Sequence, residues 1–427
     1  RSKMYYTPNK ENNVFQLVVQ YGAGEREFPK LGYAAQLMNN AGIMGAYEPQ
    51  ELKEELSKLN ATCHVTADDD NLYIIMEGYE ATLPQACQLL SRQILMPKLD
   101  EKQLARLKGS AMGMRQQRKD NVSILNEALR QYMLYGEKSD YIKELTDKEI
   151  YELQISELTG DINRASNYEA KVFFTGTLPF DQVYDILSKN LPLVANERPS
   201  NSPQAKDMMP VTENTVYFLP NNDAEQAQIH LYIPMQKADK KDDVLRSAFN
   251  QYFGLDFTGI VLNEIREKRS MAYTAYAFVG TQGIAGKASY LRGYIGTQND
   301  KANDALDVLM GLVNDMPKNP ERIDNIKSYL RQAMLTSHPS FRNKAMELVD
   351  LGYRGYTDDP AKENLPKVDA LTFDDIVKFY EENIKDKPYC ISIMGNPKNI
   401  DLKRLEKFGK VVKLNERKLF NTKDALF

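Results

Sequence analysis

The sequence predicts an α+β fold of two tandem homologous domains, each a mainly antiparallel sheet packed with helices. A strand-like run over 14–21 has a counterpart over 227–233, which starts 213 residues later. Two further strand-like runs end at Gly176 and Gly395, 219 residues apart. Near-equal offsets at both ends of a unit indicate duplication. Short turns between neighbouring strand-like segments favour antiparallel pairing over a doubly wound parallel sheet.

Apolar periodicity and turn residues predict the elements of the first half. In chain order they are a strand (14–21), a helix (33–38), a helix opened by Pro49, a hairpin (62–67 and 72–78), long helices within 80–160 and a strand (171–176). The helix after Pro49 carries one apolar stripe of leucines. The hairpin turn has three consecutive aspartates, which we interpret as a solvated turn because the rest of a calcium-loop pattern is absent.

The second half repeats this plan. It predicts a helix (244–252), a loop (254–259), a helix (260–268), strands (273–279 and 286–295), helices (300–315, 321–335 and 372–382) and a last strand (390–395). The polar stretch 195–203, which contains two prolines, indicates a linker. We therefore predict domains over 1–198 and 214–427, joined by a linker over 199–213.

Composition excludes several classes of protein. The 55 Lys and Arg against 59 Asp and Glu give a formal charge of −4, which argues against nucleic acid as a partner. The basic run 115–119 is interpreted as a solvated helix face. No run of 18 apolar residues occurs, so we expect no membrane span. The three cysteines, Cys63, Cys87 and Cys390, are interpreted as buried thiols and not as a disulfide framework.

The motifs of common active sites are also missing. The three histidines, His64, His230 and His338, include no pair at helical spacing for a metal ion. The sequence has no Cys-x-x-Cys, no Walker loop, no Gly-x-Gly-x-x-Gly and no Gly-x-Ser-x-Gly. A self-contained metal or triad site is therefore not visible in this chain.

The order of elements resembles the insulinase/pitrilysin family of zinc peptidases, the inverzincins, and the related mitochondrial processing peptidases. The resemblance covers essentially the whole chain as two tandem family domains. In active family domains the first helix carries His-x-x-Glu-His, followed by a Gly-containing loop and a Pro-Glu-Leu start of the next helix. Here the frame from Gly32 to Leu52 is similar, but the three motif positions are Ala35, Met38 and Asn39.

The family's third zinc ligand is a Glu on a helix roughly 75 residues further on, and the segment 104–119 has no acidic residue. Losing these groups together leaves nothing to bind zinc or activate its water. We expect no metal or cofactor in this chain and no peptidase activity of the chain alone. The resemblance implies that the zinc lies in a partner half.

The second half retains a different part of the family pattern. The stretch from Asn263 to Tyr273 resembles Arg-Glu-Lys-Arg-Gly-Leu-Ala-Tyr, with Ser270 where the family often has Gly. The resemblance implies that Arg266 and Tyr273 reach the peptide bound at the partner's zinc, where both could donate to an oxyanion. Seven residues make two helical turns, so both face one way if the helix extends that far. The residues alone also allow a competing interpretation. In it, Arg266 belongs to a solvated basic run and Tyr273 is an aromatic residue of a strand.

Three hypotheses follow. The chain is the non-zinc half of a pitrilysin/insulinase-type metalloendopeptidase that helps enclose a peptide substrate, or a catalytically silent scaffold of the same fold, or a hydrolase with an unrecognised site. The retained Arg266 and Tyr273 favour the first. The chain opens with Arg1-Ser2 instead of Met, so we expect a processed chain or a piece of a longer one. Family habits suggest a bacterial protein of the periplasm or the cytoplasm, and the sequence does not choose between them.

Overall fold

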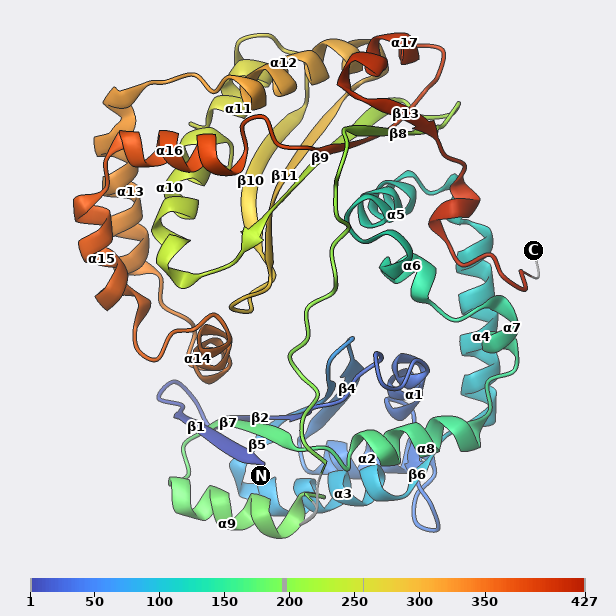
Figure 1. Ribbon diagram of the computed structural model, residues 1–427. Coiled ribbons are helices and arrows are strands. Elements are labelled where there is room, and N and C mark those ends of the chain that lie inside the picture. Colours follow the sequence, from blue (N-terminus) through green and yellow to red (C-terminus); the bar gives the residue numbers. More distant parts are fainter. Residues whose placement is uncertain (1, 194–197, 256, 426–427) are drawn as a thin grey trace.

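The computed structural model describes residues 2–193, 198–255 and 257–425. Figure 1 shows two sheets that face one another, each with helices on its outer side, and a linker that runs between them. Residues 195–197, the start of the polar stretch 195–203, lie outside the described residues. Further along, the linker is held by Asn201 N donating to Gly22 O (2.7 Å) and Met209 N donating to Leu134 O (2.7 Å).

The first sheet has the strand order β1-β7-β2-β5-β4. All its neighbours are antiparallel except β1 and β7, which are parallel. The strands are β1 (Lys3–Pro8), β2 (Val14–Tyr21), β4 (Thr62–Ala67), β5 (Leu72–Tyr79) and β7 (Ala170–Gly176); β3 (Gly42–Ile43) and β6 (Pro97–Lys98) form a separate pair.

The second sheet has the order β10-β11-β9-β12-β8-β13. Its strands are β8 (Thr215–Pro220), β9 (Gln226–Lys237), β10 (Thr274–Thr281), β11 (Ala288–Gln298), β12 (Cys390–Gly395) and β13 (Lys410–Lys413). Apart from β13, this order repeats that of the first sheet strand for strand. Antiparallel pairs again predominate, and β8 pairs in parallel with β12 and β13. The predicted α+β fold is confirmed.

Helices flank the two sheets, most of them on the outer faces (Figure 1). Those of the first half are α1 (Leu31–Met38), α2 (Pro49–Lys58), α3 (Leu83–Leu95), α4 (Glu101–Gln116), α5 (Val122–Tyr135), α6 (Asp140–Lys143), α7 (Asp147–Tyr151), α8 (Ile155–Ala165) and α9 (Phe180–Asn190). Those of the second are α10 (Asp243–Phe253), α11 (Ile260–Leu262), α12 (Ala302–Asn314), α13 (Ile323–Thr336), α14 (Lys344–Tyr353), α15 (Pro360–Ala370), α16 (Phe373–Asn383) and α17 (Leu402–Leu405). No described helix combines the length and apolar composition that crossing a bilayer needs.

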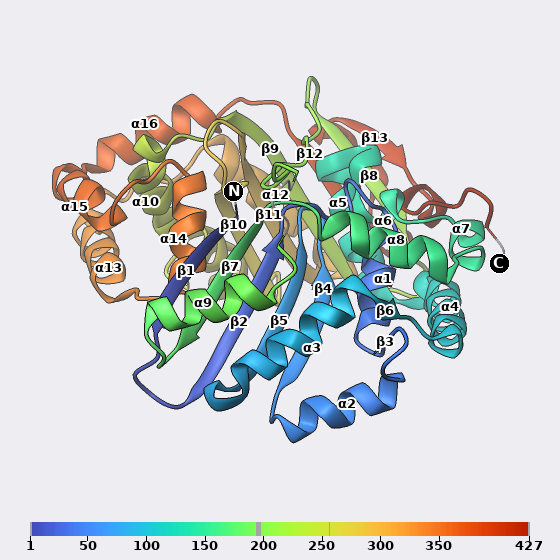
Figure 2. The same cartoon turned by 90° about the horizontal axis from the view of Figure 1, so that it is seen from below.

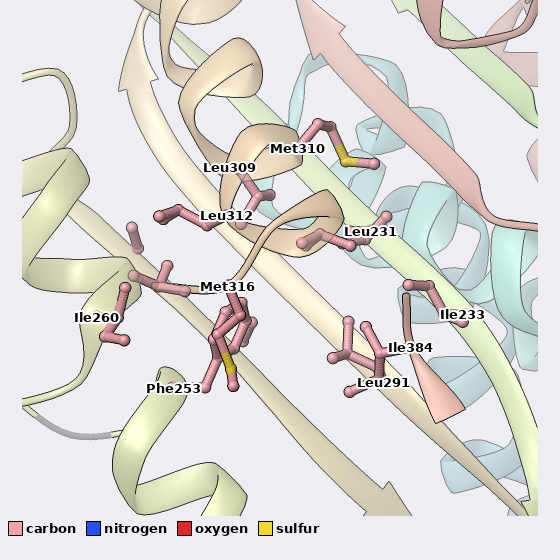
Figure 3. Close-up of a cluster of buried hydrophobic side chains, with 14 of the residues drawn as sticks. Leu231, Ile233, Phe253, Ile260, Leu291, Leu309, Met310, Leu312, Met316 and Ile384 are labelled. Carbon is pink, nitrogen blue, oxygen red and sulfur yellow. The ribbon is translucent and has the colours of Figure 1, made fainter. Parts of the chain in front are cut away.

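Each half has its own apolar core between sheet and helices. In β2 every second side chain is buried against the helices, from Phe15 through Leu17 and Val19 to Tyr21. Figure 3 shows the second core, where Leu231 and Leu291 of the sheet meet helix residues. Burying one such side chain contributes roughly 1.5–3 kcal/mol, so the two cores hold the two sheets as rigid platforms.

The halves also exchange helices across the inner faces of the sheets. Helix α5, from the first half, packs Leu125 and Leu129 against Leu219 of β8 and Met394 of β12. Helix α14, from the second half, lies beside β1 in both views (Figures 1 and 2). Just before α14, Arg342 donates to Thr175 Oγ1 (3.0 Å) and Val14 O (3.2 Å) of the first sheet. Each inner face is therefore partly covered by the other half of the chain.

Candidate functional site

The segment that carries Arg266 and Tyr273 is not one regular helix. After the short α11, residues Asn263–Glu267 form a π-helix, closed by Lys268 N donating to Asn263 O at 2.9 Å. The helix predicted over 260–268 is present, although its larger part is a π-helix, and it ends before Tyr273. That residue leads into β10, where its N donates to Gly296 O at 2.9 Å.

Ser270 makes the turn between the π-helix and β10. Its φ is 50°, in the left-handed region that glycine adopts without strain. Its N donates to Arg266 O and Met271 N donates to Ile265 O, both at 2.9 Å, which ends the helix. This conformation gives a physical reason for the glycine that the family often has here.

The turn brings Arg266 and Tyr273 to one open hollow of about 400 Å³. Its other lining residues are Glu267, Ser270, Met271, Ala272, Gln298 and Lys301. Lys301 Nζ donates to Ser270 O at 3.2 Å. The hollow therefore offers a guanidinium, an ammonium and a phenol to a ligand.

The neighbouring basic side chains are engaged elsewhere. Lys268 Nζ donates to Glu264 Oε1 at 2.8 Å, and Arg269 Nη1 donates to Glu264 Oε2 at 2.6 Å. These two hydrogen bonds, Lys268 first, lower the pKa of the Glu264 carboxyl. The side chains of Arg266, Lys268 and Arg269 are 45%, 58% and 42% exposed, as in a solvated basic run, and of the three only Arg266 lines the hollow.

Arg266 itself makes only loose contact with its neighbour. Its Nε lies 3.7 Å from Glu267 Oε1, and the two side chains are 45% and 56% exposed. Such an exposed ion pair contributes little to stability, so a ligand can displace Glu267 from Arg266. Tyr273 is 52% exposed beside it. Both side chains can turn toward a ligand such as a peptide carbonyl or a developing oxyanion.

The three degenerate motif positions lie at the end of α1. Ala35 and Met38 are 1% and 2% exposed and belong to the apolar core. The amide of Asn39 is hydrogen-bonded to the backbone of Val65. Within the described part of the chain, no cluster of three His, Cys, Asp or Glu side chains could hold a metal ion.

The helix beside α1 that would carry a third ligand is α4, and its basic end serves a structural purpose. Arg115 is 9% exposed and donates to Asp147 Oδ1 at 2.6 Å, and Arg118 is paired with Glu144. The interpretation of 115–119 as a solvated face is wrong for Arg115 and Arg118, whereas the other three residues of the stretch are exposed. These arginines hold α4 to the segments that follow it.

Comparisons with known proteins agree with this picture. Residues 166–330, which include Arg266 and Tyr273, match the family model described as the peptidase M16 inactive domain. The resemblance to the M16 (insulinase) family is confirmed. No curated protein matches the sequence.

Solved structures share the M16 fold at low identity. A peptidase M16 inactive domain from Pseudomonas fluorescens has a TM-score of 0.72 and 17% identity, over 94% of this chain and 97% of that one. The periplasmic protease PqqL from Escherichia coli has a TM-score of 0.69 and 13% identity, over 90% of this chain and 43% of that one. The ferredoxin protease FusC, in complex with Arabidopsis ferredoxin, has a TM-score of 0.69 and 12% identity, over 92% of this chain and 44% of that one.

Proposed function

We propose that this chain is the non-zinc half of an M16 metalloendopeptidase and that it supplies Arg266 and Tyr273 to peptide bound at the zinc of a partner half. The observation that carries the proposal is their meeting in one open hollow, while Lys268 and Arg269 are bound to Glu264. A purely structural role would not require Arg266 to stay unbound by Glu264 while Lys268 and Arg269 are bound to it.

The chemistry assigned to the pair is donation. Zinc in the partner half would supply the activation of water for hydrolysis of the peptide bond. The Arg266 guanidinium and the Tyr273 hydroxyl donate hydrogen bonds to the substrate carbonyl and to the oxygen that becomes negative during the attack. The chain itself contributes binding and orientation, and the extended peptide lies as an added strand at a sheet edge.

Two arrangements of the halves are compatible with the comparisons. The Pseudomonas fluorescens chain has about the same length as this one, whereas this chain spans less than half of PqqL and of FusC. The zinc half is therefore either a separate subunit or another part of one longer polypeptide. The ferredoxin bound to FusC supports a polypeptide as the substrate class.

The test is reconstitution of the full enzyme with its zinc-bearing half. We expect Arg266→Ala and Tyr273→Phe each to lower kcat by roughly 10²–10³-fold, the cost of one oxyanion donor, without preventing assembly. Tyr329→Phe and Arg331→Ala, exposed on α13 away from the hollow, are matched controls that should leave kcat unchanged. An assembled enzyme indifferent to both site substitutions would favour the scaffold hypothesis.

A further inference from the structure

Two asparagines, one in each half, bind the backbone of a strand in the same way. Asn39 Nδ2 donates to Val65 O at 3.0 Å, and Val65 N donates to Asn39 Oδ1 at 2.8 Å. Asn250 Nδ2 donates to Val279 O at 3.0 Å, and Val279 N donates to Asn250 Oδ1 at 2.7 Å. The two asparagines are 211 residues apart and the two valines 214, which matches the internal repeat.

Both valines lie on outermost strands. Val65 is on β4 and Val279 on β10, and these strands end the first and second sheets. In an antiparallel pair of strands, two residues that face one another exchange two N–H···O bonds. A strand added at either edge would form these two bonds with the N–H and the C=O of the valine. The carboxamide supplies the same donor and acceptor, so it occupies the two positions that an added strand needs.

The edge of β10 is closed further by the loop after α10. Ala277 N donates to Gly254 O at 3.0 Å. A Cβ at position 254 would lie 2.7 Å from Ala277 O and 2.9 Å from Ala277 N, so only glycine permits this approach. Together the two contacts block the backbone groups of β10 over 277–279. The stretch 274–276, which follows Tyr273, is not blocked by them.

We propose that Asn39 and Asn250 are edge clamps that exclude an added strand, above all the edge strand of a second copy of this chain, at Val65 and Val279. An outermost strand with free backbone groups is a template for association, and proteins block such strands in various ways. Here the device is one side chain per half. On β10, the clamps leave the stretch beside Tyr273 as a place where an extended peptide can pair. The proposal rests on the hydrogen bonds of this chain and not on its role in a peptidase.

A simpler role would be to dock α1 on β4 and α10 on β10. The two roles differ in what happens when the amide is removed. Loss of docking alone would lower stability and leave a monomer. Loss of a clamp would expose the N–H and C=O of one valine on an otherwise intact sheet edge, which then pairs with another copy.

The experiment uses the chain alone, so its outcome is independent of the zinc half. Asn39→Ala, Asn250→Ala and the double variant are compared by hydrogen–deuterium exchange and by sedimentation velocity across a wide range of protein concentration. At low concentration, Asn39→Ala should speed amide exchange at Val65 on the order of tenfold and leave Val279 unchanged, and Asn250→Ala should do the reverse. Asn40→Ala is the matched control, because Asn40 accepts from Lys53 Nζ at the same helix end.

The double variant should self-associate as concentration rises, and the amides of β4 and β10 should become protected again in the assembly. Unchanged exchange at both valines would overturn the proposal. Faster exchange with a monomer at every concentration would also overturn it and assign the asparagines to docking. If the alanine variants do not fold, Asn39→Ser and Asn250→Ser, too short to reach the strand, give the same comparison.

Discussion

His230 Nε2 lies 2.7 Å from Asn126 Oδ1, in a hydrogen bond between β9 of the second half and α5 of the first. The imidazole is 3% exposed. Burial, followed by the charges of Arg130 and Arg292, lowers the pKa of His230 to about 3. The neutral ring therefore donates from Nε2 to the amide oxygen, and acid should weaken this junction between the halves.

The first prediction concerns that acid sensitivity. The unfolded chain binds a proton at His230 near pH 6.5 and the folded chain only near pH 3, so stability is lost as pH falls through this window. His230→Gln should reduce the slope of unfolding free energy against pH between 6.5 and 4.5 by up to about 1.4 kcal/mol per pH unit. Denaturant unfolding at several pH values measures it. Equal slopes in the two proteins would contradict the assignment.

Glu25 should act in the opposite direction. Burial, followed by the charges of Asp69, Asp140 and Asp68, raises its pKa to about 7. The folded chain thus holds a proton that the unfolded chain loses near pH 4.5, and stability falls as pH rises from about 4.5 to about 7. Glu25→Gln should stabilise the protein above pH 7 by about 1–3 kcal/mol and change little below pH 4.5. The exposed neighbour Glu27, changed to Gln, is the control, and a stabilisation independent of pH would count against the explanation.

Ser270→Gly should stabilise the protein by about 1 kcal/mol, because a left-handed conformation strains serine and not glycine. Thermal or denaturant unfolding provides the measurement. Ser337→Gly is the control, since Ser337 ends α13 at a φ of −79° and gains nothing from glycine. A destabilised Ser270→Gly protein would show that the serine side chain supports the turn.

Gly254→Ala should destabilise the protein by about 1–3 kcal/mol, because the new Cβ would collide with the backbone of Ala277. Gly311→Ala in α12 is the opposite case. No heavy atom lies within 4 Å of its added Cβ, so the better helix propensity of alanine should raise stability by about 0.5–1 kcal/mol. Equal effects of the two substitutions would contradict the close approach of the loop to β10.

We also expect no stoichiometric zinc at Ala35, Met38 and Asn39. Two of these side chains are apolar and the third is an amide already bound to β4, so none offers the imidazole or carboxylate that zinc prefers. Metal analysis of chain purified without chelator provides the test, with a zinc-bearing M16 half as the positive control. One zinc per chain at this position would overturn the expectation.

Local patterns predicted the regular elements well. The strand over 14–21, the helix starting at Pro49 and the strand over 390–395 are found at those bounds. Each is set by alternation, periodicity or a helix-starting residue within a few positions, which is the information that a sequence holds locally.

Features that depend on distant partners were missed. Strands β1 and β8 were not predicted, and each pairs in parallel with a strand more than 160 residues away, a pairing that no local pattern shows. The π-helix at Arg266 shows no signal in the sequence either. Asn39 was visible only as a lost ligand position, and its bond to Val65 depends on how α1 docks on β4. The offset between Asn39 and Asn250 was the one available signal.

The exchange of α5 and α14 bears on how this architecture arose. Each half completes the inner face of the other with an element from the corresponding part of the repeat. Two identical copies of a single ancestral unit, each lending its helix to the other, would form a symmetric dimer with the same contacts. Fusion of the two copies into one polypeptide, followed by divergence of their sequences, would give the present chain. On this view the linker is a late addition, and a chain cut there should remain one particle.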